Sequence, residues 1–486
     1  MNTSELLGRA VAVAHSPITA EVFARRMRPR IVGLDRHAPL HGGATRPYVN
    51  LDNAATTPAL RDVTEGVTEF LEWYGSVHRG TGAKSLISTR AYDDSRRIVA
   101  EFVGADPEYH TVLFTCSATG GLNKVAHQLA HVHGGKPLVL CTMMEHHSNM
   151  LPWREHCRVD YVEVNGADGT LDMDHLQDRL RKHDGQVRLV AVCGASNVTG
   201  LIPPLRSIAR MAHEHGAEML VDGAQLVPHR RVLMGAPDDP ERIDYLAFSG
   251  HKMYAPFGSG VLVGPKRTFS QGAPDNVGGG TVRLVTLDEV LWADLPEREE
   301  PGTPNAVGAV ALARATSVLR ETGMENIGAH ETALRRRAVE GLRGVPGIHV
   351  FSETAPAEYD RVGVVGFTTD GVEHALLASA LGHEWGVAVR HGCFCAHPYI
   401  VRLLGVPAEE VRRLIERARA DDHAHFPGLV RLSLGMYNTA QEIDYAIGAI
   451  RSIIEEGPHC RYELDRPSGE FLPQDSPIEL DPCFRL

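Results

Sequence analysis

The chain has 486 residues, 43% of them hydrophobic, so it can bury a large core and is expected to form two or three domains. Its net charge of −12, from 61 acidic and 49 basic residues, comes without a basic stripe, which argues against nucleic-acid binding. No apolar run reaches the length of a membrane span. Eight cysteines in so long a chain do not indicate a disulfide framework, and we expect a cytoplasmic protein.

The chain begins with an Arg-rich segment, residues 8–33, that weakly resembles an organellar transit peptide. A surface helix explains this composition equally well and is the interpretation we prefer. We expect residues 1–47 to be an N-terminal extension and residues 48–310 to be a large domain. A smaller domain, residues 311–455, and a C-terminal tail, residues 456–486, complete the expected organisation.

From about residue 110, short apolar runs alternate with amphipathic segments. Helical periodicity ending in glycine marks residues 120–134 and 204–216. Strand–helix alternation predicts a mainly parallel sheet with helices on both faces. The seven runs that we interpret as buried strands are "HTVLFTC", "PLVLCTM", "VDYVEV", "VRLVAVCGAS", "AEMLVDGA", "IDYLAFSG" and "GSGVLVG".

Lys252 lies in "IDYLAFSGHKMYAPFGSGVLVG", between two of these strands. An isolated lysine is most often a surface residue, but apolar sequence encloses this one on both sides. A lysine in such a place tends to have a lowered pKa, which suits an amine that forms imines.

Two further strand ends carry polar groups. Asp222 ends the strand in "AEMLVDGAQLVPH", where a carboxylate could hold the ring nitrogen of pyridoxal phosphate protonated. A helix N-cap is an equally good explanation for a lone aspartate there. In "FTCSATGGLNKVA", the free amides of Ala118 and Thr119 and the Thr119 hydroxyl would form a phosphate cup at a helix N-terminus.

The segment "VRHGCFCAHPYIV" places His391, Cys393, Cys395 and His397 at alternate positions. Alternate residues of an extended chain lie roughly 7 Å apart, too far to converge on one zinc ion with bonds of about 2.0–2.3 Å. A bridge between the two cysteines would also be strained. We therefore favour an exposed, reactive Cys395 near Arg390, and we expect no metal site.

Four other cysteines lie in or near strands and are expected to be small buried apolar residues. They are Cys116, Cys141, Cys157 and Cys193.

Taken together, these motifs resemble the class V aminotransferases of fold type I, and most closely the group II cysteine desulfurases and selenocysteine lyases. The resemblance covers residues 48 to 455 and includes "YVNLDNAATTP", "VHRGTGAKS", "MEHHSNMLPW", "GASNVTG", "VDGAQ", "FSGHKMYAPFG", "PGTPN", "RHGCFCAHP" and "VRLSLGMYNT". It implies a seven-stranded, mainly parallel sheet in a large domain that binds pyridoxal 5'-phosphate. The smaller α/β domain would then carry the cysteine loop.

The resemblance also implies a role for each matching residue. Lys252 would carry the cofactor covalently and move protons, Asp222 would pair with the pyridine nitrogen, and Gln225 would face the phenolic oxygen. His146 would stack on the ring. The phosphate would be bound by Ala118, Thr119, Ser249, His251 and, from a second subunit, Thr303. Asn197 and Arg431 would hold the substrate carboxylate, and Cys395 would accept the sulfur.

The implied protein is a homodimeric desulfurase that converts cysteine to alanine and leaves a persulfide on Cys395, from which an acceptor protein could take the sulfur. The same fold leaves open carbon–sulfur lyases, selenocysteine lyases, epimerases and transaminases. A non-catalytic sulfur carrier or scaffold is a third reading, against which intact Lys252, Asp222, His146 and Arg431 argue.

Overall fold

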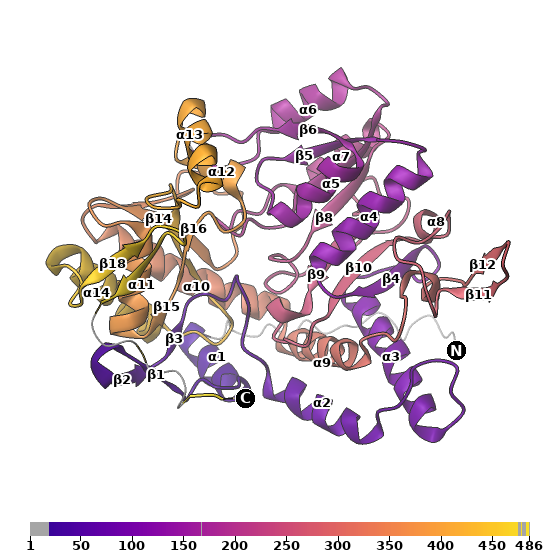
Figure 1. Cartoon of the computed structure of the whole chain (residues 1–486), viewed down its shortest axis with the longest axis horizontal. Coiled ribbons are helices and arrows are strands. Elements are labelled where there is room, and N and C mark those ends of the chain that lie inside the picture. Colours follow the sequence, from indigo (N-terminus) through magenta and orange to yellow (C-terminus); the bar gives the residue numbers. More distant parts are fainter. Residues whose placement is uncertain (1–18, 167, 475–477, 479–482, 486) are drawn as a thin grey trace, which may run out of the picture.

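The computed structural model describes residues 19–166, 168–474, 478 and 483–485. Its centre is a seven-stranded sheet whose strands coincide with the seven apolar runs (Figure 1). β10 is antiparallel to both of its neighbours and the other pairs are parallel, so the expected mainly parallel sheet is confirmed. In spatial order the strands are β4 (His110–Thr115), β10 (Gly260–Pro265), β9 (Tyr245–Ser249), β8 (Glu218–Asp222), β7 (Val187–Cys193), β5 (Leu138–Thr142) and β6 (Arg158–Val162).

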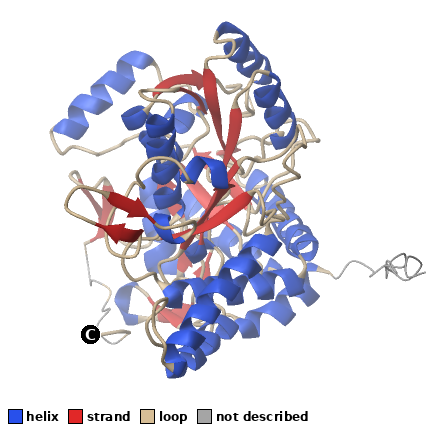
Figure 2. Cartoon of the chain, turned by 90° about the vertical axis from the view of Figure 1, so that its right-hand side faces the viewer, coloured by secondary structure: helices blue, strands red, loops and turns tan. Residues whose placement is uncertain are grey.

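Helices cover both faces of this sheet because successive strand residues point to opposite sides (Figure 2). Leu138 and Leu140 belong to one apolar core, and Val139 and Cys141 belong to the core on the opposite face. α4 (Ala118–Val132) and α5 (Leu151–His156) pack on the second core. The first core is completed by α2 (Arg61–Trp73), α3 (Ala83–Phe102), α6 (Met173–Lys182), α7 (Leu205–Glu214) and α9 (Ala306–Thr322).

A second, four-stranded antiparallel sheet lies in the C-terminal part of the chain. Its order is β13 (Ile348–Val350), β14 (Val364–Thr369), β17 (Leu429–Ser433) and β16 (Arg390–Gly392). Three helices bury their apolar faces against it, namely α10 (Met324–Arg343), α11 (His374–Trp385) and α14 (Ala440–Glu456). This is the smaller α/β unit that the sequence implies, while the domain boundaries drawn from the sequence stay a prediction.

The N-terminal extension packs against this C-terminal unit. α1 (Ala20–Met27) buries Phe23 and Met27 and lies against α10, so a helix is present within the Arg-rich segment. Residues 1–18 lie outside the described residues. β3 (Val49–Asn50) then pairs in parallel with β15 (Val387–Ala388), which brings the next residues of the chain beside β17.

The remaining elements are short or peripheral. β1 (His37–Pro39) pairs with β2 (Thr45–Pro47), β11 (Val282–Val285) with β12 (Val290–Trp292), and β18 (Tyr462–Asp465) with β19 (Glu470–Pro473). The other helices are α8 (Lys266–Phe269), α12 (His397–Leu403) and α13 (Ala408–Arg419). None of the helices in the described part of the chain combines the length and apolar character of a membrane span.

Candidate active site

A cavity of about 330 Å³ opens between the carboxyl edge of the large sheet and the C-terminal unit. Parallel strands bring their carboxyl ends to one edge, which is where ligands bind in sheets of this type. Eleven of the twelve residues assigned from the sequence line this cavity: Ala118, Thr119, His146, Asn197, Asp222, Gln225, Ser249, His251, Lys252, Cys395 and Arg431. Their assigned roles stay predictions.

Lys252 reaches the cavity from the end of β9, on the short 3₁₀ helix η4 (Gly250–Lys252). The protein removes water from around its amine, and this burial lowers the pKa of Lys252 to about 8, although the carboxylate of Asp222 acts in the opposite direction. A neutral amine is the form that attacks a carbonyl carbon, so the site favours imine formation.

Asp222 faces the same space from the end of β8. Its Oδ1 accepts a hydrogen bond from the backbone N–H of Ala224 over 3.0 Å, and burial raises its pKa. Gln225 follows on the next turn, and its Nε2 donates to the carbonyl oxygen of Ala54 over 2.6 Å. Its Oε1 is buried and has no hydrogen-bond partner among the described residues. Buried polar atoms are normally paired, so this orphan indicates a polar ligand.

Ala118 and Thr119, which the sequence predicts to bind phosphate, lie where β4 turns into α4. The N–H of Ala118 donates to Oγ of Ser249, and the Thr119 hydroxyl lies 2.8 Å from that of Ser148. His251 places Nδ1 3.2 Å from Oγ1 of Thr56. Hydroxyl and amide groups at a helix N-terminus can donate hydrogen bonds to a bound anion. Ser148 and Thr56 were not recognised from the sequence.

His146 lines the same cavity, and burial lowers its pKa to about 4, with Lys252 and other cations adding to the effect. A neutral imidazole suits stacking against a planar ring. Directly before it, the fully buried Glu145 accepts hydrogen bonds from Nδ2 of Asn149 and the N–H of Cys193. The sequence motif "MEHHSN" contained Glu145, but the residue received no role there. It fixes the turn that carries His146.

Arg431 enters from β17 with a buried guanidinium. Nη1 donates to the carbonyl oxygen of Asn197 over 3.0 Å, and Nη2 donates to Oδ1 of Asp52 over 2.9 Å. Its Nε is buried and has no partner among the described residues. The guanidinium also lies 4.7 Å from the centre of the Phe394 ring. Of the five N–H donors of Arg431, these contacts engage two, so Nε–H is among the donors left for a ligand such as a carboxylate.

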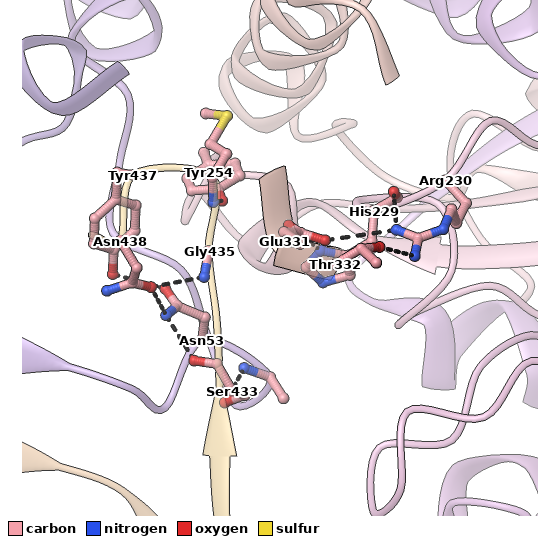
Figure 3. Close-up of polar contacts among 12 residues, drawn as sticks. Asn53, His229, Arg230, Tyr254, Glu331, Thr332, Ser433, Gly435, Tyr437 and Asn438 are labelled. Atoms are coloured by element: carbon pink, nitrogen blue, oxygen red, sulfur yellow. Dashed lines mark hydrogen bonds and ion pairs between the residues drawn. The ribbon is translucent and has the colours of Figure 1, made fainter. Parts of the chain in front are cut away.

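Asp52 was missed by the sequence assignment although "YVNLDNAATTP" contains it. Its Oδ2 also accepts from Nη2 of Arg390 over 2.8 Å, so one carboxylate bridges two arginines. The turn after Asp52 is held by polar contacts drawn in Figure 3. Asn53 donates to the carbonyl oxygen of Ser433 and accepts from the Tyr437 hydroxyl.

The two thiols of the cysteine loop have different surroundings. Cys395 is exposed and lines the cavity, and its carbonyl oxygen accepts from the N–H of His147. Cys393 donates from Sγ to the carbonyl oxygen of Pro427 over 3.3 Å, and burial, followed by Cys395, raises its pKa to about 11. Cys393 is therefore held as a thiol away from the cavity, whereas Cys395 is accessible.

The structure does not bring every noted residue to the cavity. Thr303 is exposed and is not part of the lining in its own chain. Its role from a second subunit stays a prediction. His391 and His397 contact Glu470 and His147, respectively.

The expectation that Cys116 is buried is wrong, because this residue follows the last residue of β4 at the open sheet edge and is exposed. Cys141, Cys157 and Cys193 are buried as expected.

Comparison with known proteins identifies the family. The model of the family described as "Aminotransferase class-V" matches residues 49–446. The chain belongs to the class-V aminotransferase family. A cysteine desulfurase from Haloferax volcanii is 36% identical over 432 residues, covering 87% of this chain and 93% of the relative. A cysteine desulfurase from Cronobacter sakazakii is 34% identical over 414 residues, covering 83% of this chain and 93% of the relative.

Solved structures agree with this class-V assignment. The apo structure of the cysteine desulfurase from Thermococcus onnurineus NA1 superposes with a TM-score of 0.73 at 30% identity, covering 84% of this chain and 95% of that one. The cysteine desulfurase CsdA from Escherichia coli, in an S-sulfonic acid form, gives a TM-score of 0.72 at 27% identity, covering 88% of this chain and 97% of that one. The fold is therefore that of fold type I enzymes, as the sequence implied.

Proposed function

We propose that this class-V family member is a cysteine desulfurase that depends on pyridoxal 5'-phosphate. The reaction converts L-cysteine to L-alanine and leaves the sulfur on Cys395 as a persulfide. The observation that carries the proposal is that an exposed thiol, a lysine with a lowered pKa and a buried arginine with an unpaired donor share one cavity.

The residues of the cavity fit the cofactor. Lys252 would bind it covalently, Asp222 would pair with the ring nitrogen, and the flat face of neutral His146 would cover the ring. The orphaned Oε1 of Gln225 marks where a polar partner belongs. The phosphate of the cofactor would be bound by Ala118, Thr119, Ser249 and His251. When bound, the cofactor supplies an electron sink for the substrate carbon.

Binding of the amino acid is assigned to Arg431 and Asn197. The planar guanidinium of Arg431 keeps N–H donors, Nε–H among them, beyond those that Asn197 and Asp52 engage, and this geometry matches a carboxylate. Asn197 is held in place because its Nδ2 donates to the carbonyl oxygen of Phe394 over 2.7 Å. Lys252 would take the proton from the substrate Cα, since its amine is poised near neutral pH.

Sulfur transfer is assigned to Cys395. Its thiolate attacks the substrate sulfur and the carbon–sulfur bond breaks, with the electron pair remaining on the substrate carbon. That carbon then takes a proton, so that alanine leaves and the enzyme retains one sulfur as a persulfide. Cys393 is a poorer acceptor, because its pKa is raised to about 11 and its Sγ is engaged with Pro427.

The test is to incubate the cofactor-loaded protein with L-cysteine and a thiol reductant, and to quantify alanine, sulfide, pyruvate and ammonia. Alanine and sulfide in equal amounts, lost in Lys252→Ala, support the proposal. Pyruvate and ammonia instead would identify a carbon–sulfur lyase. Faster turnover of selenocysteine would identify a selenocysteine lyase, and a protein that never takes up cofactor would revive a non-catalytic role.

A homodimer is proposed on two grounds. The β11–β12 hairpin projects from the body of the chain and exposes large apolar side chains, among them Leu284, Leu287 and Leu291 (Figure 1). Thr303 lies outside the cavity of its own chain, as expected for a residue that serves a second subunit.

A sulfur-acceptor protein and a cytoplasmic location are also part of the proposal. The exposed position of Cys395 supports the first, since a persulfide there is open to a partner. None of the cysteines that the structure describes is disulfide-bonded, which supports the second.

A further inference from the structure

The C-terminal tail, which lies beyond the residues matched by the family model, forms a hairpin next to the cysteine loop. β18 and β19 pair in antiparallel register from Tyr462↔Pro473 to Asp465↔Glu470, and β19 packs along α11 (Figure 1). An isolated two-stranded hairpin is marginally stable at best, so its contacts with the rest of the protein must hold it.

The base of the hairpin is fixed to α11 by one buried carboxylate. Glu384, with a side chain only 3% exposed, accepts hydrogen bonds from the N–H groups of His459 and Cys460 and from the hydroxyl of Tyr462, each over 3.0 Å. Three donors converging on a buried carboxylate form a specific attachment rather than a loose surface contact.

The turn of the hairpin contacts residues 422–428, a segment that also contacts the cysteine loop. Arg466 forms an ion pair with Asp422 over 2.9 Å, and the ring of His423 donates to the carbonyl oxygen of Pro467. The same segment supplies the carbonyl of Pro427 that accepts from Cys393. The hairpin and the cysteine loop therefore contact one connecting segment from two sides.

A direct contact also links the hairpin to β16, the strand that leads to Cys395. Nε2 of His391 lies 2.8 Å from Oε2 of Glu470, and Nδ1 of His391 lies 3.3 Å from Nδ1 of His374. His374 uses its other nitrogen to donate to the carbonyl oxygen of Phe426, so its Nδ1 is left to accept. His391 therefore links the hairpin, through Nε2 and Glu470, to α11, through Nδ1 and His374.

The cysteine loop has a backbone that requires such support. Phe394 has φ 49° and Cys395 has φ 56°, and two consecutive non-glycine residues in the left-handed region are disfavoured. Conformations of this kind persist only where the surroundings impose them. On the cavity side, Asn197 and His147 hold the carbonyl oxygens of Phe394 and Cys395.

We propose that the hairpin of residues 459–473 is a brace that positions the Cys395 loop for sulfur abstraction, with Glu470 as a positioning residue that acts through His391. The inference rests on the proposed function, because its purpose is to hold the sulfur-accepting thiol. Glu470 does not line the cavity, so its effect on the reaction must pass through the loop that carries Cys395.

The test compares Glu470→Ala with Glu463→Ala in the cofactor-loaded full-length protein. Glu463 lies on the same hairpin, and its carboxylate pairs with Gln474 rather than with β16. Because a displacement of about 1 Å can cost up to about 100-fold in rate, we expect kcat for alanine to fall roughly tenfold in Glu470→Ala. KM for cysteine and the cysteine-induced change in visible absorbance should stay as in the wild type, and Glu463→Ala should be unaffected.

A double-mutant cycle separates positioning from general loss of structure. His391→Ala combined with Glu470→Ala should be no slower than His391→Ala alone, because both changes remove the contact between His391 and Glu470. Additive losses, or a drop in kcat accompanied by loss of cofactor, would overturn the proposal. The rate at which iodoacetamide labels Cys395 should also change in Glu470→Ala but not in Glu463→Ala. If the wild type makes no alanine, the proposed function fails, and this labelling rate alone decides the positioning: equal rates in the two variants would refute it.

Discussion

Arg431 donates from Nη2 to Oδ1 of Asp52 over 2.9 Å inside the cavity, although the two residues are 379 positions apart in the chain. The arginine side chain is 3% exposed and that of the aspartate 16% exposed, so the pair is largely removed from water. Asp52 neutralises the arginine that is proposed to receive the substrate carboxylate, and it links that arginine to Arg390 at the start of the cysteine strand.

Replacing Asp52 with Asn should destabilise the protein. A buried arginine left without its counter-charge costs about 3 kcal/mol in the free energy of unfolding, measured by urea denaturation. The control is Asp62→Asn, which breaks the more exposed pair with Arg30 and should cost less than about 1 kcal/mol. Equal losses in the two variants would show that Arg431 does not depend on Asp52.

Replacing Arg431 should weaken substrate binding more than it slows chemistry. Loss of a charge-assisted hydrogen bond costs about 1.5–3 kcal/mol, so Arg431→Ala should raise KM for cysteine roughly 10- to 100-fold in steady-state assays. Arg431→Lys should restore only part of this loss, because a single ammonium cannot reproduce the guanidinium fork. An unchanged KM in both variants would remove Arg431 from substrate binding.

The two loop thiols should behave differently. Cys395→Ala should keep the bound cofactor and its spectral response to cysteine but lose persulfide formation, whereas Cys393→Ala should retain alanine production. Cys393 is held as a thiol by burial and by Pro427, and Cys395 is accessible. Peptide mass spectrometry after one turnover without reductant locates the added sulfur. Sulfur on Cys393, with Cys395→Ala active, would reverse the assignment.

The stability of the cofactor-free protein should depend on pH through Lys252. Its pKa in the folded state, about 8, lies below the ordinary 10.5, so the unfolded chain binds more protons between these values and stability rises with pH in that window. Below pH 8 the buried amine must be protonated in the folded state, and this lowers the free energy of unfolding by about 3 kcal/mol. Lys252→Met should therefore be more stable than the wild type at pH 7, and the difference should shrink toward pH 10.5. The free energies of unfolding of both proteins are measured by urea denaturation from pH 7 to pH 10.5. If the difference between them does not change with pH, the lowered pKa of Lys252 is contradicted.

Much of the fold followed from local patterns. The seven apolar runs became the seven strands, because strands buried on both faces are continuous in hydrophobic residues. Asp222 and Lys252 could be placed together since they lie at or just after the carboxyl ends of strands, and parallel strands share that edge. Motif order then added residues from the C-terminal unit, such as Arg431.

Contacts between distant segments were decided only by the tertiary structure. Asp52 reaches Arg431 because β3 pairs with β15, and nothing local to "YVNLDNAATTP" specifies that pairing. The exposure of Cys116 depends on where β4 ends relative to α4, which apolar composition alone does not define. The contact of Glu470 with His391 arises because the tail folds back on α11, since hydrogen bonds between segments far apart leave no periodic signal in either one.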